Sequence, residues 1–310
     1  MVKSTPSEEL DCCRLRGASP AEIAHLSTSW SSIPHAAELV IATPSDEAIL
    51  LGAFQRSSEI DPFYASLPMY RRGSGGAAAR IGPGTIWIRL ALSRPDALVD
   101  ATAPKLLNRY VRPLLRALTK SGAHAHYFDR DWISVAHRPV GLVGFAHDMR
   151  SGRASFEAII AVTTPFAPSA RASFLEKEPA TIAELKSRSD VEHIADAIEE
   201  AYCSLALATT ITSPARTPAP RVLSNRPWTA TLEEALGTIA AGRDENGVLR
   251  LGGELMASRD AVERLENRLA SAPAVDVGEA VDEAFAPPAV IFGVRSLVSI
   301  RDVVLSARDA

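Results

Sequence analysis

The alternation of apolar and polar residues divides most of the chain into strands, with helices in fewer places. The helix signals are Ser19-Pro20-Ala21-Glu22, which has the form of a capped helix start, and apolar residues at helical spacing over 103–121 and from 190 to about 205. Runs rich in β-branched and aromatic residues predict strands at 38–42, 48–54, 86–92, 123–128, 132–137, 140–146 and 154–162. Turn residues at 43–46 predict a hairpin between the first two strands. A block of strands after a single helix favours an α+β fold, in which helices flank a mixed central β-sheet.

A second, smaller domain is expected after a proline-rich segment. Residues 211–228 hold four prolines among Ser, Thr and Arg, which is the composition of a linker. Residues 229–310 then predict a small α/β domain, with a capping box at Thr231–Glu234, strands at 248–256 and 289–292, and helices at 258–269, 277–285 and 296–307. Residues 1–17 have no apolar core segment, so we expect disorder there and no signal peptide. The main domain would then span 18–210.

The segment from Met69 to Trp87 carries the strongest candidate chemistry. Two arginines enter a run of Gly, Ser and Ala, and an apolar strand follows. Backbone N–H groups exposed by such a loop, beside paired guanidinium groups, suit a carboxylate or a phosphate. The alternative is a plain turn, because Gly accepts positive φ at no steric cost. For Arg72 the alternative is an exposed ion pair, and for Ser74 it is a hydroxyl that stabilises the turn.

These residues resemble a known motif. The run Arg71–Ala78 resembles the Arg-Arg-x-Ser-Gly-Gly-Gly-Ala motif of the lipoate–protein ligase A family, a group that includes biotin ligases and octanoyltransferases. Upstream, Ile49–Gln55 is similar to the family's apolar strand that ends in Gly-x-x-Gln. Near the other end, Leu251–Met256 and Arg264–Leu269 are similar to a strand and a helix of the family's accessory domain. The chain departs from the motif at Ala77, where the family has Gly, and at Ile81, where a His often follows. The resemblance implies a biotin/lipoate ligase-like catalytic domain and an accessory-like domain.

The resemblance also implies a reaction and its ligands. Members of the family activate lipoate or octanoate with ATP and Mg²⁺ as an acyl-adenylate, and pass the acyl group to a lysine of a lipoyl carrier domain. The expected ligands and partners are therefore a small acyl molecule and such a carrier. Carried over to this chain, the residues that hold the acyl carboxylate and phosphate are Arg71, Arg72, Ser74, Gly75, Gly76 and Ala77, and the apolar tail would lie against Leu51 and Trp87. We expect Arg72→Ala to cost ligand affinity with little loss of fold stability.

One residue of the family's chemistry is absent. A family lysine in a Lys-Ile-x-Gly strand bridges the acyl carbonyl and the phosphate, where negative charge builds up during attack. Its position falls on Pro139 or Gly141, and no lysine occurs between Lys120 and Lys177. The candidate substitutes for its charge are Arg80 and Arg138. Two hypotheses follow: a lipoate ligase or acyltransferase that works without the lysine, or a pseudoenzyme that binds an acyl ligand or a carrier domain. A lysine placed at Gly141 or Pro139 would test for a lapsed active site.

The composition of the chain limits which partners and which cellular location are expected. An apolar content of 46% and a mean hydropathy of +0.04 support a folded core. A net charge of −4 argues against a nucleic-acid partner, and the lack of a long apolar run argues against a membrane, so the expected location is the cytoplasm. The three cysteines have no metal-type spacing, and His124 and His126 lack a third ligand, so no metal site is predicted.

Overall fold

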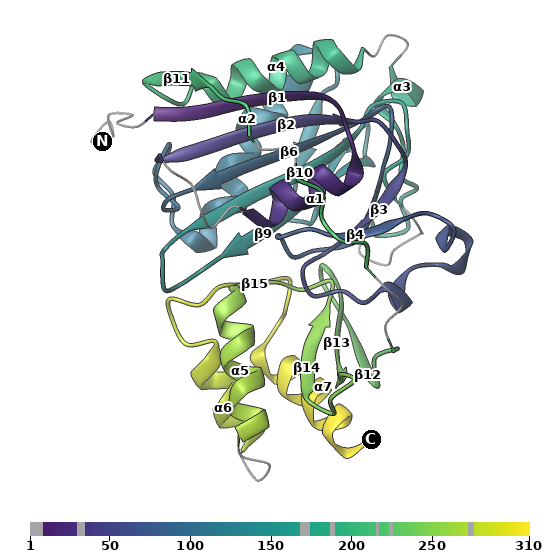
Figure 1. Ribbon diagram of the computed structural model, residues 1–310, viewed down its shortest axis with the longest axis vertical. Helices are drawn as coiled ribbons and strands as arrows, with labels where there is room; N and C mark the ends of the chain where they lie inside the picture. Colours follow the sequence, from purple (N-terminus) through teal and green to yellow (C-terminus); the bar gives the residue numbers. More distant parts are fainter. Residues whose placement is uncertain are drawn as a thin grey trace.

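Two units of different size make up the chain, a large one above and a small one below in Figure 1. The computed structural model describes residues 9–29, 35–167, 174–186, 190–214, 217–222, 226–271 and 276–310. The strands of the large unit are β1 (Glu9–Ala18), β2 (Ala37–Pro44), β3 (Ala48–Leu51), β4 (Met69–Arg71), β5 (Ala79–Ile81), β6 (Thr85–Leu92), β7 (Ala125–Tyr127), β8 (Trp132–Val135), β9 (Arg138–His147), β10 (Ala154–Ala161) and β11 (Ala208–Ile211). Its α-helices are α1 (Pro20–Thr28), α2 (Leu106–Lys120), α3 (Ile182–Leu185) and α4 (Val191–Cys203).

A mixed sheet of eight strands, in the order β11-β1-β2-β6-β10-β9-β8-β7, forms the centre of the large unit. β1 pairs in parallel with β2 and with β11, and the other pairings are antiparallel. A second sheet, β4-β3-β5, contains the strands on either side of the glycine-rich loop. The predicted α+β fold with a mixed central sheet is therefore confirmed.

Both faces of the large sheet are covered. Ile86, Ile88 and Leu90 of β6 point to one face, where they pack with apolar residues of α2 and α4. Trp87 points to the other face, which α1 and the small β4-β3-β5 sheet cover, as Figure 1 shows for α1. Strands buried on both faces read as continuous apolar runs, which is why 86–92 was predictable as a strand.

The small unit has a core of its own. It consists of the sheet β12 (Ala230–Glu234), β13 (Gly237–Arg243) and β14 (Leu249–Gly253), the pair β15 (Met256–Ala257) and β16 (Ile291–Phe292), and the helices α5 (Arg259–Ser271), α6 (Val277–Ala284) and α7 (Leu297–Asp309). Apolar residues of the helices and of β13 and β14 form one cluster, which Phe54 of the large unit joins at its edge. No helix within the described ranges is long and apolar enough to cross a membrane, and no cluster of metal-ligating side chains occurs there.

Four expectations from the sequence need correction. Residues 9–17, expected to be disordered, lie in β1, because Leu10 and Cys12 pack under α4; residues 1–8 lie outside the described part. β2 and β3 do not form a hairpin, since β2 pairs with β1 and β6. Thr231–Glu234 is in strand β12 and does not start a helix, because β13 supplies its backbone hydrogen bonds. The linker, expected to begin at residue 211, begins later, since Ile211 is the last residue of β11.

Candidate functional site

The glycine-rich loop between β4 and β5 is folded around its own arginine. The Arg72 side chain is 1% exposed, so the alternative of an exposed ion pair is wrong. Its guanidinium donates hydrogen bonds to the carbonyl oxygens of Ser74 (3.3 Å), Gly75 (3.2 Å) and Ala77 (2.8 Å). We also expect Arg72→Ala to cost more than a little fold stability, because the buried carbonyls of Gly75 and Ala77 would lose this donor, whereas that of Ser74 keeps the Ala53 N–H. Ligand binding by Arg72 stays a prediction.

Arg71 supports the turn that the Gly-x-x-Gln resemblance marks. Its Nη1 lies 3.0 Å from the carbonyl oxygen of Gly52, 3.2 Å from that of Ala53 and 2.5 Å from that of Gln55. The Gln55 side chain closes the same turn by accepting from the Gly52 N–H at 3.0 Å. Burial lowers the pKa of Arg71; the charge of the Glu59 carboxylate opposes that shift in part, and the positive charge of Arg259 adds to it. The Gly-x-x-Gln segment and the arginine-glycine segment are thus joined by hydrogen bonds of the Arg71 side chain.

The glycines of the loop allow close contact with other parts of the protein. Gly75 N–H donates to the Phe145 carbonyl of β9 at 2.8 Å, and Gly76 N–H donates to the Leu255 carbonyl of the small unit at 2.9 Å. A Cβ on Gly75 would lie 2.2 Å from the Leu255 oxygen, and one on Gly52 would lie 2.0 Å from the Gly76 oxygen. These two amides of the expected anion cradle therefore already bind protein carbonyls.

Ser74 leads to a buried carboxylate below the loop. Its hydroxyl donates to Glu157 of β10 at 2.5 Å, and Ser27 of α1 donates to the same carboxylate at 2.8 Å. Trp87 of β6 donates to Glu157 through its indole N–H. Glu157 is 1% exposed, so this network places negative charge beneath the loop that was expected to bind an anion.

The two expected acyl-tail residues belong to different apolar clusters. Leu51 and Trp87 are both fully buried, but Leu51 packs with Ile49 and Ala78, whereas Trp87 belongs to the cluster between the large sheet and α1. The sequence pattern identified both as apolar strand residues and could not separate these two environments.

Of the two positions for the family lysine, Gly141 cannot take a side chain without rearrangement of its neighbours. A Cβ on Gly141 would lie 2.5 Å from the carbonyl oxygen of Ile159 and 2.7 Å from Ile160, on the helix-covered face of the sheet. A lysine there would collide with β10, so that substitution cannot test for a lapsed site. Pro139 lies near the start of β9 and is buried.

The candidate substitute arginines are engaged elsewhere. Arg80 on β5 forms an ion pair with Glu47 at 2.6 Å. Arg138 donates to the carbonyl oxygens of Glu178 (3.0 Å) and Pro179 (2.8 Å). Both guanidinium groups therefore stabilise local structure in this conformation.

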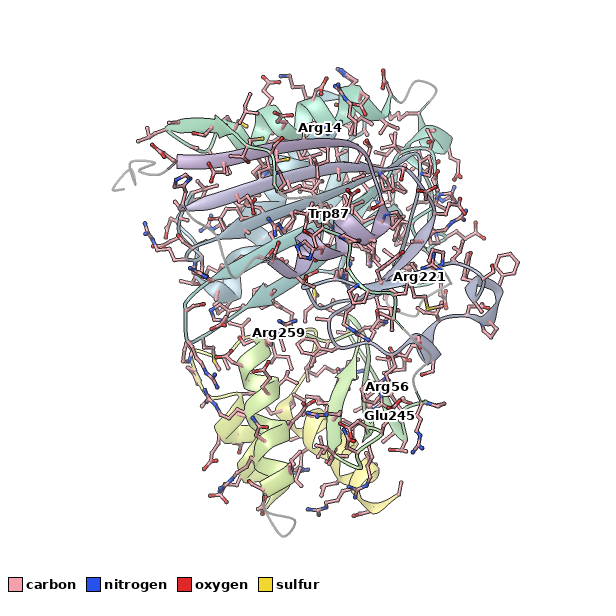
Figure 2. The ribbon with its side chains drawn as sticks, in the orientation of Figure 1. Arg14, Arg56, Trp87, Arg221, Glu245 and Arg259 are labelled. Carbon is pink, nitrogen blue, oxygen red and sulfur yellow. The ribbon has the colours of Figure 1, made fainter. Side chains whose placement is uncertain are left out.

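A groove of about 320 Å³ lies beside the loop, between the two units. Its wall includes Arg71 and Gln55 from the large unit and Trp228, Arg250 and Arg259 from the other side. Figure 2 shows Arg259 at the end of α5 that meets the large sheet. The sequence patterns gave no sign of Arg259, because its place beside Arg71 depends on how two distant segments dock.

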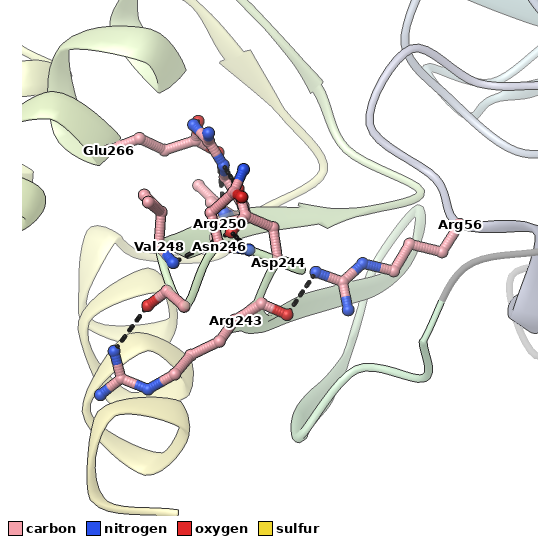
Figure 3. Close-up of polar contacts among 9 residues, drawn as sticks. Arg56, Arg243, Asp244, Asn246, Val248, Arg250 and Glu266 are labelled. Atoms are coloured by element: carbon pink, nitrogen blue, oxygen red, sulfur yellow. Dashed lines mark hydrogen bonds and ion pairs between the residues drawn. The ribbon is translucent and has the colours of Figure 1, made fainter.

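The acidic residues of the groove wall are largely neutralised. Arg250 pairs with Asp244 at 2.9 Å and with Glu266 at 2.7 Å, as the close-up in Figure 3 shows. Glu263 lies one turn further along α5 from Arg259. Arg259 itself forms no ion pair or hydrogen bond through its side chain with any residue of the described ranges. The groove therefore contains both Arg71 and a second guanidinium, that of Arg259, which is not held by an ion pair within the described ranges.

Arg56 of the large unit also lines this groove. Its guanidinium lies 3.7 Å from the centre of the Trp228 ring. It also donates to the carbonyl oxygens of Arg226 (3.0 Å), Pro227 (3.1 Å) and Arg243 (3.2 Å), the last of which Figure 3 shows. A cation that stacks on an indole and caps three carbonyls holds the two units in register.

His147, at the end of β9, provides a pH-dependent contact between the units. Its Nδ1 lies 2.9 Å from the hydroxyl of Ser258, which also accepts from the Val290 N–H. Burial lowers the pKa of His147 from its ordinary 6.5, and the charges of Asp260 and Asp148 oppose that shift only in part. The folded protein therefore favours the neutral imidazole.

We expect this contact to weaken in acid. Because the pKa is lower in the folded state, the unfolded state binds the extra proton first, so stability falls as the pH drops below about 6.5. Gln at position 147 keeps an acceptor for Ser258 but does not titrate. Urea unfolding of wild type and His147→Gln at several pH values between about 7.5 and 5.5 should show a steeper loss for wild type, and parallel curves would contradict the assignment.

No protein-family model matches the sequence, and no curated protein matches it. Solved structures do match: a bi-partite lipoate protein ligase from Thermoplasma acidophilum, described with its E2 lipoyl domain, is 13% identical with a TM-score of 0.53 over 67% of this chain and 87% of that one. A lipoate-protein ligase A bound with ATP is 14% identical with a TM-score of 0.53, covering 66% and 87%.

The third comparison extends over both units. LipL1 of P. falciparum, in complex with lipoate, is 10% identical with a TM-score of 0.61 over 96% of this chain and 99% of that one. The chain thus has the fold of the lipoate–protein ligases, as the resemblance of Arg71–Ala78 implied. At these identities the likeness establishes the fold alone.

Proposed function

We propose that this protein binds lipoate, octanoate or an adenylate of one of them in the groove between its two units. We propose further that it is a pseudoenzyme, which binds the ligand but does not form the adenylate. The observation that carries the proposal is the pair Arg71 and Arg259, two guanidinium groups that line one groove, where the charge of Arg259 lowers the pKa of Arg71 although the Glu59 carboxylate raises it. A carboxylate or phosphate placed between them would relieve their repulsion and gain charge-assisted hydrogen bonds. The solved relatives bound to lipoate or ATP make these ligands the first to test.

The second half of the proposal rests on the loop. In a ligase that needs a lysine ammonium, positive charge must lie where negative charge develops. Here the sequence has no lysine between Lys120 and Lys177, and the carboxylate of Glu157 accepts hydrogen bonds beneath the loop. Donors of Arg72 and the amides of Gly75 and Gly76 are engaged with protein carbonyls. Such a loop supports a folded scaffold for binding better than it supports adenylation.

Arg259→Ala is the sharpest test of the ligand site. We expect about tenfold weaker binding of lipoate and of a non-hydrolysable lipoyl-adenylate analogue, since a charge-assisted hydrogen bond to the ligand is lost. The fold should be unaffected, because Arg259 repels Arg71 in the free protein. Isothermal titration calorimetry measures the affinity, and thermal unfolding checks the fold.

Arg80→Ala serves as the matched control, since it removes one guanidinium from a partly exposed ion pair outside the groove. Unchanged affinity in Arg259→Ala would contradict the site. ATP–pyrophosphate exchange that depends on lipoate or octanoate would contradict the absence of adenylation, and would make the protein a ligase whose charge comes from an arginine. Transfer to a carrier domain would then be the next reaction to measure.

A further inference from the structure

A second cavity lies on the opposite face of the large sheet from the glycine-rich loop. Its volume is about 520 Å³, it is open to solvent on one side, and it is bounded by the start of α2, the end of β7 and two segments of the small unit. Leu236 and Phe292 of the small unit belong to the same apolar cluster as α2, whereas Ala77 and Ala79 of the loop region belong to the cluster on the other face. The cavity is therefore separate from the groove that contains Arg71 and Arg259.

The lining of this cavity is divided into an apolar part and a cationic part. Leu107, Leu236, Phe292 and the ring of Tyr127 supply the apolar wall. The cationic side chains all come from the first two turns of α2 and the residue before it: Lys105, Arg109 and Arg112. A volume of this size, with apolar walls and a few polar groups on one side, is typical of small-molecule sites.

The cations of the cavity are poorly compensated. Arg112 donates to Asn108 at 3.1 Å, and Asn108 in turn donates to Asp129, the carboxylate on the cavity wall, at 2.8 Å. Lys105 and Arg109 form no ion pair or side-chain hydrogen bond with any residue in the described part of the chain. The exposed Lys105 and the half-buried Arg109 are therefore not held by a partner among the described residues.

The positive charges of Lys105 and Arg109 lie at the start of α2, where they destabilise the helix as long as no anion is bound. Lys105 is the N-cap residue of α2 and also ends a 3-10 turn, Ala103–Lys105, that leads into the helix; no side chain caps α2, and its first turn carries no acidic residue. Cations are destabilising near a helix N-terminus, where the macrodipole favours negative charge. An anion bound between Lys105 and Arg109 would remove that penalty.

Tyr127 adds a neutral donor. Burial raises the pKa of its hydroxyl, and the charges of Asp129 and Asp131 raise it further. The hydroxyl thus keeps its proton at neutral pH and can donate a hydrogen bond to a ligand in the cavity.

We propose that this cavity binds an amphipathic anion, with an apolar body between Leu107, Tyr127 and Phe292 and a carboxylate or phosphate head group at Lys105 and Arg109. Because the large unit and the small unit both contribute walls, the ligand bridges them and stabilises their docking. Phe292 also packs edge-on against Phe145, with ring centres 4.8 Å apart, and the Phe145 carbonyl accepts from Gly75. The ligand would therefore touch Phe292, whose neighbour Phe145 contacts the glycine-rich loop.

Three probes of equal chain length distinguish the head groups. Decanoate, decyl phosphate and decanol are titrated into the full-length protein below their micelle-forming concentrations, with isothermal titration calorimetry and thermal unfolding as readouts. We expect saturable binding of at least one of the two anions, a rise of the melting temperature with its concentration, and much weaker binding of decanol. Which anion binds more tightly identifies the head group as a carboxylate or a phosphate monoester.

Two kinds of variant locate the binding. Lys105→Ala/Arg109→Ala should weaken binding of the anion at least about tenfold, whereas Arg116→Ala, which removes a charge from the same helix outside the cavity, should leave it unchanged. Leu236→Trp should block binding by filling the cavity without any change of charge. Arg259→Ala should not affect it, which separates this site from the proposed groove.

Equal affinity of the anions for wild type and for the double variant overturns the proposal, as does the absence of saturable binding by both anions. Loss of binding in Arg259→Ala with retention in the double variant also overturns it, because the ligand then occupies the groove.

Discussion

Replacing Glu157 with alanine is expected to lower the free energy of unfolding by about 3 kcal/mol or more. The substitution leaves the hydroxyls of Ser27 and Ser74 and the indole N–H of Trp87 without their buried acceptor. Each unsatisfied buried donor costs about 1–3 kcal/mol, and the recovered desolvation energy of the carboxylate offsets only part of the sum. Urea unfolding followed by tryptophan fluorescence measures the change.

Two variants control this experiment. Glu157→Gln keeps one oxygen acceptor in place and should cost clearly less than alanine. Glu200→Ala breaks an ion pair with Lys120 in which both side chains are about two-thirds exposed, and should cost well under about 1 kcal/mol. If Glu157→Ala is as stable as Glu200→Ala, the buried network does not hold the loop against the sheet.

Gly75→Ala is expected to separate the two units. A Cβ at this position would lie 2.2 Å from the Leu255 oxygen and 3.1 Å from the Met256 Cα, and both atoms are backbone of the small unit. A backbone cannot rotate away as a flexible side chain can, so relief requires that the small unit moves. We expect a larger radius of gyration in solution scattering, faster proteolysis within 211–228, and a loss of at least about 2–3 kcal/mol of stability.

Gly82→Ala is the matched control. Its new Cβ would lie 3.0 Å from the Cγ of Glu47, which is an exposed side chain that can turn aside. Scattering and proteolysis should therefore match those of wild type. Wild-type compactness in Gly75→Ala would show that the contact between the loop and Leu255 does not hold the units together.

How far the sequence predicts this protein depends on how local each feature is. The capping box at Ser19 formed as predicted, since it needs only Glu22 three residues later. The same signal at Thr231 was wrong, because pairing with β13 overrides a local preference for helix. The strand at 86–92 was predictable because both faces of β6 are buried and its apolar run is continuous.

In the candidate site, too, the local sequence predicted the residue types but not their partners. The residue types at Arg71, Arg72 and Ser74 indicated chemistry for an anion, yet the structure has them holding carbonyls and a carboxylate. Their partners lie across turns or on β10, and no periodicity reveals such pairings. Arg259 lies 188 positions after Arg71 and approaches it only after two units have folded and docked. Fold recognition from a motif therefore succeeded where assignment of roles to single side chains required the structure.

The parallel pairing of β1 with β11 has a consequence for synthesis of the chain. Glu9 of β1 pairs with Ala208 of β11, so β1 cannot form this pairing until about 200 further residues have been synthesised. At translation rates of about 5–20 residues per second, this delay lasts on the order of 10–40 s. During that time the outer edge of β1 lacks its partner, and open strand edges favour pairing with other chains. In a nascent chain this edge of β1 therefore stays open until Ile211 has been synthesised.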